Sequence, residues 1–359
     1  MKKITVLIFC LSFTNLFSQK FLWKAEVKSF FDNCEFDASK VTSSQTMGGT
    51  RFVPEVGIFM EDYHKIFVGI DAMHEFGSIK AIDYYDPIVY YHFLSENFRF
   101  YTGAFPRRLI LERYPRMFFA DSIKNYRPNV NGIFWEYHSA KNFFNIWMDW
   151  TGRQSYTERE TFFLGWQGRY KTDIFYLQQF GYLFHFAGFM YPDKNDNVHD
   201  NALVLTSLGV DFSSKTNFDE LDLNVGLSYG FDKERKIDKL YQPFGLLSEL
   251  RVEYKGLGIF NSLYVGQGQQ NFYSDHQNNL YWGDPFYRND FYNRTDLYIY
   301  FFKNESVKLK MIYSLHFTEQ KMFHQQAFYA SVVFCNFNNK EQKKNQYIWD
   351  KWLKNKQKE

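Results

Sequence analysis

The sequence predicts an all-β protein, a transmembrane antiparallel up-and-down β-barrel of about 16 strands. Aromatic residues make up 21% of the 359 residues, and aromatic side chains favour strands. Apolar and polar side chains alternate along many segments, which is typical of a strand with one apolar face. These segments run for about eleven to sixteen residues, whereas soluble strands peak near five or six and a tilted membrane-spanning strand needs about nine to eleven.

The first residues predict export. Lys2 and Lys3 precede an apolar run at 4–17 that is too short to cross a bilayer as a helix, and Ser18 is a small residue at the expected cleavage point. We therefore expect a signal peptide over residues 1–18. Removal of its two lysines lowers the formal net charge from +2 to 0, so the mature chain has no general attraction to nucleic acid.

Residues 307–317 show the alternation most clearly, with apolar Val307, Leu309 and Met311 on one face and lysines on the other. The same period recurs along the whole mature chain. The predicted strands lie near 21–33, 50–61, 65–76, 82–93, 97–106, 129–140, 142–152, 159–170, 172–188, 200–213, 219–231, 243–255, 257–270, 293–303, 305–318 and 325–337. We interpret residues 19–337 as a single barrel domain.

The connections alternate between short turns, such as 62–64 and 94–96, and long loops, such as 34–49, 107–128 and 271–292. Outer-membrane barrels have short periplasmic turns and longer external loops. The even strand number places both ends of the barrel on the periplasmic side. The pattern predicts a multi-pass protein of the cell outer membrane; a large soluble β protein with an aromatic core is the alternative.

This topology resembles that of the general porins of Gram-negative outer membranes. The signal peptide, which ends Phe17-Ser18-Gln19, resembles those of the Bacteroidota. The resemblance implies a channel for small hydrophilic solutes, with outer-membrane lipids, lipopolysaccharide and the barrel-assembly machinery as partners, and it is compatible with a homo-oligomer. The chain departs from the family after Phe337, because such barrels usually end on an aromatic residue of the last strand.

The loop 107–128 is long, basic and partly apolar, and it is the third long connection. We expect it to fold inward, to pack its apolar side chains on the wall and to narrow the lumen. Its basic residues would then favour anions in a constriction. An external loop, or a lid that binds lipopolysaccharide phosphates, is the alternative. The predicted constriction residues are Arg107, Arg108, Arg113, Arg116, Lys124 and Arg127.

Acidic and basic residues on the polar strand faces are expected to line a water-filled lumen. Their mixed sign argues against strong selectivity. The predicted lining residues are Glu136, Glu249, Arg251, Glu253, Lys308 and Lys310.

Ser314 and His316 are the basis of an enzymatic alternative. Residues two apart in a strand share a face, and an imidazole can activate a hydroxyl. The order is the reverse of the His-x-Ser pair of outer-membrane phospholipases and deacylases, and the two residues face the lumen. No phosphate-binding glycine loop, His-Glu-x-x-His or Cys-x-x-Cys occurs in the sequence. We therefore expect no enzyme, no metal and no cofactor.

Two further expectations concern cysteines and the C-terminus. Cys34 and Cys335 are placed at opposite ends of neighbouring strands, too far apart for a disulfide, so both are predicted to be free thiols. Residues 338–359 form a basic periplasmic tail. Ile348 and Trp352 lie on one side of a possible helix, which predicts a short amphipathic helix on the inner leaflet; a disordered tail is the alternative.

The function predicted from these observations is passive diffusion of small hydrophilic solutes, with a preference for anions, through a porin-like channel. The alternative is an outer-membrane barrel without transport, either a scaffold for surface-polysaccharide assembly or a lipid-modifying enzyme.

Overall fold

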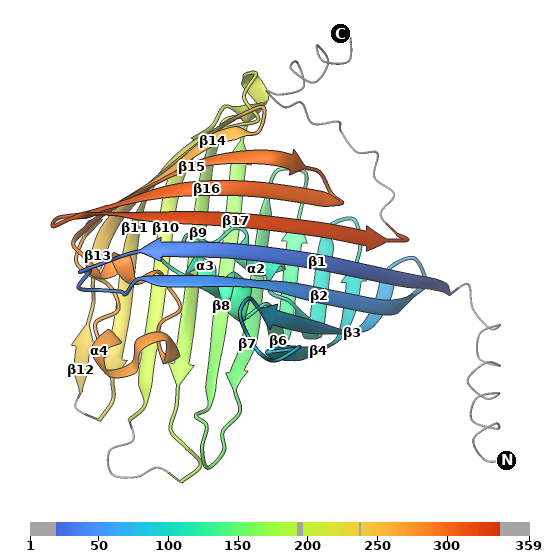
Figure 1. The fold of residues 1–359 in the computed structure, drawn as a ribbon, viewed down its shortest axis with the longest axis horizontal. Helices are drawn as coiled ribbons and strands as arrows, with labels where there is room; N and C mark the ends of the chain where they lie inside the picture. Colours follow the sequence, from blue (N-terminus) through green and yellow to red (C-terminus); the bar gives the residue numbers. More distant parts are fainter. Residues whose placement is uncertain (1–18, 192–196, 237, 338–359) are drawn as a thin grey trace.

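The computed structural model describes residues 19–191, 197–236 and 238–337, which form one closed barrel of long antiparallel strands (Figure 1). The first strand pairs with both the second and the last, so the sheet has no open edge. The strands are β1 (Lys20–Glu35), β2 (Gln45–Met60), β3 (His64–Glu75), β4 (Tyr84–Leu94), β5 (Phe98–Pro106), β6 (Asn129–His138), β7 (Phe143–Gly152), β8 (Thr161–Thr172), β9 (Phe175–Phe186), β10 (His199–Asp211), β11 (Glu220–Glu234), β12 (Lys239–Tyr241), β13 (Phe244–Tyr254), β14 (Leu257–Gly266), β15 (Phe291–Lys303), β16 (Val307–Thr318) and β17 (Met322–Cys335).

The predicted architecture is confirmed: sixteen long strands build the barrel, and the three-residue β12 only extends the pairing of β11. Strand ends differ from the expected ones by a few residues. For example, β9 begins at Phe175, because Asp173 takes a positive φ of 42° in the turn after β8. The predicted signal peptide and the predicted tail lie outside the described residues.

The side-chain alternation separates the outer face of the barrel from its interior. In β16, Met311 and Tyr313 are exposed on the outside, whereas Ile312, Ser314 and His316 are buried inside. Large exposed apolar side chains occur on most other strands in the same way. An apolar outer band of this kind faces lipid in outer-membrane barrels.

The ends of the barrel strands also agree with the predicted topology. Lys24 of β1 pairs with Cys335 of β17. The first strand therefore begins beside the end of the last strand, at the short-turn end of the barrel. Cys34 lies near the other end of the same pair of strands, opposite Gln325. Both thiols are free, as predicted. Among the described residues, no helix is long and apolar enough to cross a membrane.

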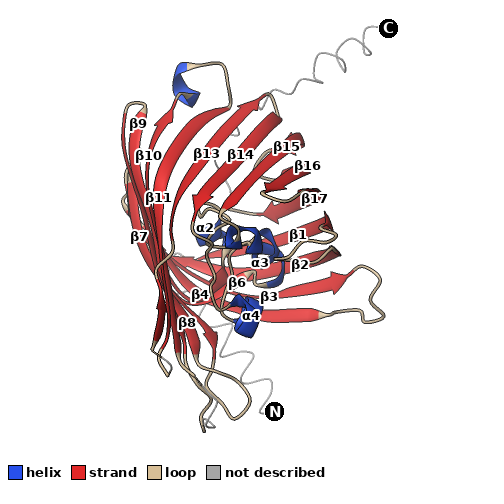
Figure 2. Ribbon diagram, turned by 90° about the vertical axis from the view of Figure 1, so that its left-hand side faces the viewer, coloured by secondary structure: helices blue, strands red, loops and turns tan. Residues whose placement is uncertain are grey.

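Two of the long loops enter the barrel (Figure 2). The first, 107–128, contains α2 (Arg108–Leu111) and α3 (Asp121–Tyr126). The second, 267–290, contains α4 (Tyr273–His276), η3 (Gln277–Asn279) and η4 (Pro285–Arg288); η2 (Ser213–Lys215) lies in a turn at the opposite end. We call the two inserted loops together the plug.

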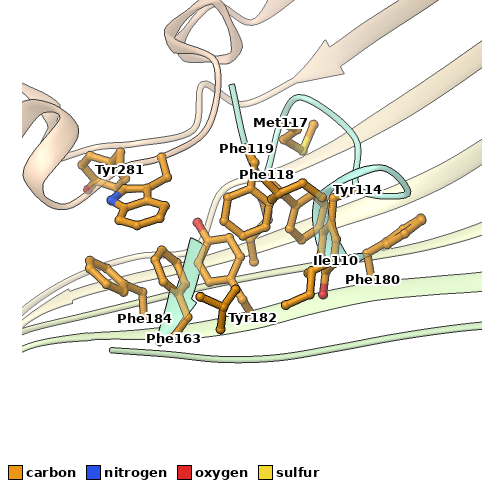
Figure 3. Packing of buried hydrophobic residues seen from close by; sticks show 14 of the residues in the cluster. Ile110, Tyr114, Met117, Phe118, Phe119, Phe163, Phe180, Tyr182, Phe184 and Tyr281 are labelled. Carbon is orange, nitrogen blue, oxygen red and sulfur yellow. The ribbon is translucent and has the colours of Figure 1, made fainter. Parts of the chain in front are cut away.

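The plug supplies much of the hydrophobic core of the molecule. Figure 3 shows Tyr114 and Phe118 of the first loop against Phe180 and Tyr182 of the wall. In the second loop, the ring of Trp282 lies 4.9 Å from that of Phe163. This contact removes the aromatic side chains of both the plug and the wall from water. Their burial therefore favours an inserted plug over loops in free solvent.

The two plug loops are also joined to each other by backbone hydrogen bonds. The amide of Asp284 donates to the carbonyl of Arg116 at 2.9 Å. At Gly283 the chains approach so closely that an added Cβ would lie 2.1 Å from the carbonyl oxygen of Met117. Only glycine fits this approach without a backbone shift.

Candidate functional site

The loop 107–128 lies inside the lumen and is anchored on the wall by its aromatic side chains. Tyr114 donates from its hydroxyl to the carbonyl of Trp166 at 2.8 Å and accepts from the indole nitrogen of Trp147 at 3.0 Å. Both of these partners belong to strands, so the loop has a fixed position. The expected contact of its apolar residues with the wall is present.

The basic side chains of this loop do not stand free in an open passage. Arg107 pairs with the buried Asp149, and Arg108 pairs with Glu26. Arg113 Nη1 lies 2.9 Å from Glu136 Oε2. The barrel wall supplies a buried carboxylate for each of these three guanidinium groups, and the buried Arg107 requires one.

Arg116 belongs to a buried network that joins the plug to β15. Its guanidinium contacts Asp121 at 2.6 Å and Asp296 at 2.8 Å, and Arg294 contacts the same two carboxylates at 3.3 and 2.7 Å. Burial raises the pKa of Asp121, but Arg116, Lys124 and Arg294 outweigh burial and hold that pKa well below its usual value. The carboxylate is therefore ionised.

The two remaining basic residues of the predicted constriction have weaker contacts. Lys124 pairs with Asp121 at 3.0 Å, and the Arg127 guanidinium lies 5.6 Å from the Trp282 ring centroid. The structure brings the six basic residues together on the plug, where acids from several strands neutralise most of them. Those acids are far away in sequence, so local charge counting could not reveal the pairing. A role of these residues in a solute pathway stays a prediction.

The predicted lining residues face the interior at different heights. Glu253 accepts from Lys303 Nζ at 2.6 Å, and Lys310 Nζ lies 3.9 Å from the Tyr298 ring centroid. Of the other predicted lining residues, the acids Glu136 and Glu249 are buried. The bases are more accessible: Arg251 lies 3.8 Å from Glu249, and Lys308 is exposed.

Ser314 and His316 do not form a catalytic pair. Ser314 accepts a hydrogen bond from Arg294 at 3.2 Å. His316 has a partner on each ring nitrogen, the Tyr292 hydroxyl at 2.8 Å and Gln325 Oε1 at 3.0 Å. Because both nitrogens are engaged in a buried core, the imidazole is not available to activate a hydroxyl. The interpretation of the two residues as polar interior side chains agrees with this geometry.

A second polar site lies on the outer face of the barrel. Phe184 and Phe186 contact plug residues inside the lumen, so His185 between them points outward. Its Nδ1 lies 3.2 Å from Asp200 Oδ1. Arg235 holds the same carboxylate with two hydrogen bonds, of 2.5 Å to Oδ2 and 2.9 Å to Oδ1.

The hydrogen bond to Asp200 fixes which nitrogen of His185 is basic. An ionised carboxylate only accepts hydrogen bonds, so Nδ1 carries the proton in the neutral ring. The lone pair of Nε2 is then free to accept a proton from another molecule. A carboxylate behind the imidazole, as here, orients the histidine that acts as general base in many hydrolases.

Two other histidines point outward at the long-loop end, and their environments differ. His324 Nδ1 lies 2.7 Å from the Tyr313 hydroxyl. His74 Nδ1 lies 2.9 Å from the Lys80 carbonyl and 3.6 Å from Asp83. His185 is thus the one of the three that hydrogen-bonds a carboxylate.

This outer site was not predicted from the sequence. His185, Asp200 and Arg235 stand on or beside three successive strands, and no motif joins them. The available signal was the presence of polar residues on a face that is otherwise apolar. Over the ranges that the structure covers, no group of three or more metal-ligating side chains is gathered in a way that could hold a metal ion.

Comparison with solved structures identifies outer-membrane barrels. A loop-deletion form of OmpT, an outer membrane protein of Vibrio cholerae, is similar with a TM-score of 0.53 and 8% identity, over 88% of this chain and 100% of that chain. OprB of Pseudomonas putida has a TM-score of 0.48 and 9% identity, over 88% of this chain and 94% of that chain. OmpF of Salmonella typhi has a TM-score of 0.46 and 10% identity, over 88% of this chain and 97% of that chain. At such identities, the likeness to OmpT shows the fold alone. No curated protein matches the chain.

Comparison with family models gives a more specific result. Residues 15–342, which include the whole barrel, match a family described as Lipid A 3'-O-deacylase-type. That description names an enzymatic activity, so the expectation of a protein that is not an enzyme is wrong. The enzymatic alternative argued from the sequence rested on Ser314 and His316, which face the lumen and do not form a catalytic pair. By the extent of this match, the chain belongs to the lipid A 3'-O-deacylase-type family.

Proposed function

We propose that the protein is an outer-membrane lipid-modifying enzyme that hydrolyses an acyl ester of a lipid A-type glycolipid. Membership of the deacylase-type family supports the reaction class. The filled lumen supports it as well, because the plug occupies the space through which a solute would diffuse. These observations favour the lipid-modifying enzyme over the diffusion channel.

The observation that carries the proposal is the position of the His185–Asp200 pair on the lipid-facing wall. From Phe175 at the short-turn end of β9 to His185, ten residues of a tilted strand rise by about 25 Å, which is about the height of the apolar band of such barrels. The intervening outward side chains include the exposed Leu177 and Leu183. His185 therefore lies at the outer edge of the apolar band, where acyl chains join the sugar headgroup of an outer-leaflet glycolipid.

In this setting His185 would act as the general base. Its Nε2 would take a proton from a water molecule, and the oxygen of that water would attack the acyl carbonyl carbon. Asp200 would stabilise the imidazolium that forms, and Arg235 would keep the carboxylate in place. The imidazolium would then return the proton to the sugar oxygen as the ester bond breaks, which releases a fatty acid and a free hydroxyl.

The test is acyl release from lipid A by the purified protein in mixed micelles, followed by mass spectrometry. We expect wild-type protein to release a fatty acid and His185→Gln to be slower by about 10² to 10⁴, the usual contribution of a general base. His324→Gln is the matched control, because it alters another outward histidine at the same end, and it is expected to keep full activity. Equal rates for wild type and His185→Gln would refute the assignment of the base.

A further inference from the structure

A cavity of about 480 Å³ remains inside the barrel below the plug, between β4, β5, β6 and β7. Its residues come from the short-turn ends of these strands, so the cavity lies toward the periplasmic side. Its volume is within the range of small-molecule sites, about 300–1,000 Å³.

The charge of this cavity is positive. Arg99 and Arg113 share a single carboxylate, that of the buried Glu136, with Arg99 Nε at 3.1 Å from Oε1 and Arg113 Nη1 at 2.9 Å from Oε2. Lys141 adds a third cation at the rim. The lining thus holds three lysine or arginine side chains against one acid, which leaves two uncompensated positive charges.

Two histidines of the cavity lining each carry a ring nitrogen without a hydrogen-bond partner. These nitrogens are His92 Nε2 and His138 Nδ1, both shielded from solvent. The His92 ring stacks on Tyr101 with centroids 4.2 Å apart, which fixes its orientation. His138 Nδ1 is 3.9 Å from the nearest Glu136 oxygen, beyond hydrogen-bond distance. Polar nitrogens that are buried without a partner are unfavourable.

Part of the cavity lining is apolar. Leu94, Tyr101 and Phe143 contribute to it, and the guanidinium of Arg113 lies 4.0 Å from the Phe143 ring centroid. A site with convergent cations beside an aromatic surface suits a compact molecule with an anionic group and an apolar body.

The neighbouring cavity has the opposite character. It has a volume of about 290 Å³ and shares Arg113 and Phe143 with the first. Its wall carries five acids, Glu112, Asp211, Glu220, Asp222 and Glu249, against the three bases Arg113, Arg169 and Arg251. Attraction of anions is therefore a property of the first cavity and not of the whole periplasmic half of the barrel.

We propose that the larger cavity is a binding site for a small organic anion, a carboxylate or a phosphate, that enters from the periplasm. Arg113 belongs to the plug, which covers the cavity on its outer side. The ligand would therefore bind in a closed-ended pocket and would not pass through the barrel. This inference does not depend on the proposed deacylase activity.

The test is isothermal titration of the full chain in detergent micelles with inorganic phosphate and, separately, with benzoate; glycerol is the uncharged control. We expect saturable binding of at least one anion and none of glycerol. Preference for phosphate or for benzoate then tells which anionic group the site takes. Lys141→Gln or Arg113→Gln should weaken binding by about tenfold or more, because each removes a cation that faces the ligand.

The matched control is Arg251→Gln, which removes a cation from the smaller cavity and is expected to leave binding unchanged. Retention of the folded barrel in each variant is checked by the difference in gel migration between heated and unheated samples. The proposal is overturned if neither anion binds saturably. It is also overturned if Arg251→Gln weakens binding as much as Lys141→Gln and Arg113→Gln do, or if neither of those two variants weakens it.

Discussion

The amide of Ala120 donates a hydrogen bond of 2.7 Å to the carbonyl of Trp282. The two residues belong to different loops of the plug, and this bond runs alongside the one from Asp284 to Arg116. The loops thus pair with each other inside the barrel as well as with the wall. Because both loops must be in place for either to be fully bonded, we expect them to dock and detach together.

The close approach at Gly283 tests this coupling. In Gly283→Ala the new Cβ would collide with the Met117 carbonyl, so the plug loops must separate, at a cost of about 1–3 kcal/mol. Urea unfolding in detergent should show a lower midpoint, and limited proteolysis should cut 107–128 faster. Gly168→Ala is the control, because its Cβ would be crowded only by a Phe144 ring atom at 3.2 Å, which can move, and its contact with the Phe143 carbonyl oxygen at 3.5 Å is an ordinary one. An unchanged midpoint in Gly283→Ala would argue against coupled loops.

The plug should also determine conductance. We expect wild-type protein to be closed to ions in planar bilayers, since aromatic core residues fill the lumen. Replacement of 109–126 and 270–285 by short glycine-serine linkers should open steps of large conductance, because sixteen strands enclose a wide lumen. Large, stable conductance of the wild type would instead support the porin hypothesis.

Arg107 is expected to be structural. It is almost fully buried and pairs with the equally buried Asp149. Arg107→Met would leave that carboxylate unpaired and should lower the free energy of unfolding by about 3–5 kcal/mol. Arg153→Met, a change at an exposed position, should shift it by no more than about 0.5 kcal/mol. A comparable effect of the two substitutions in denaturant titrations would contradict this assignment.

The second plug loop should respond to mild acid. His276 Nε2 on α4 lies 2.8 Å from His199 Nε2, which requires that at least one ring be neutral. Burial, with a contribution from Arg159, lowers the pKa of His276 below its usual value near 6.5. A group whose folded-state pKa is depressed contributes stability above its unfolded pKa, and this stability is lost as the pH falls.

We therefore expect the loop 267–290 to be less protected from amide hydrogen exchange at about pH 5 than at about pH 8, once the exchange rates are corrected for the intrinsic effect of pH. The nearby acids Asp275 and Glu234 favour the protonated ring but do not outweigh burial. In His276→Gln the acid-induced loss of protection should be much smaller. A wild-type protection pattern that is the same at both pH values would contradict the prediction.

Much of the barrel could be predicted from the sequence, because lipid on one side and an interior on the other impose a period of two on every strand. In Val307–Thr318, burial alternates in this way from Met311 to His316. The entry of 267–290 into the barrel was not predicted, because the alternation of loop lengths indicated only a long external loop at 271–292. Its aromatic residues Tyr281, Trp282 and Phe286 were the available signal, and they are buried against side chains that are distant in sequence.

The sites were less predictable than the fold. The basic residues of 107–128 were recognised as a group, but their neutralisation depends on acids from other strands, such as Glu26 and Asp296. The outer site was missed because His185 and Asp200 come together only through the register of β9 and β10. Local patterns identify which face a residue occupies, whereas its partner depends on strand pairing.

The most direct test of a barrel that acts on lipid from its outer face is the rate of fatty-acid release from vesicles that contain lipid A, for wild type and Asp200→Asn. An amide in place of the carboxylate can turn its NH₂ group toward Nδ1 and thus favour the wrong imidazole tautomer, so we expect release by the wild type and a loss of about 10²-fold or more in the variant. No release by the wild type, or equal release by both proteins, would contradict the proposed function.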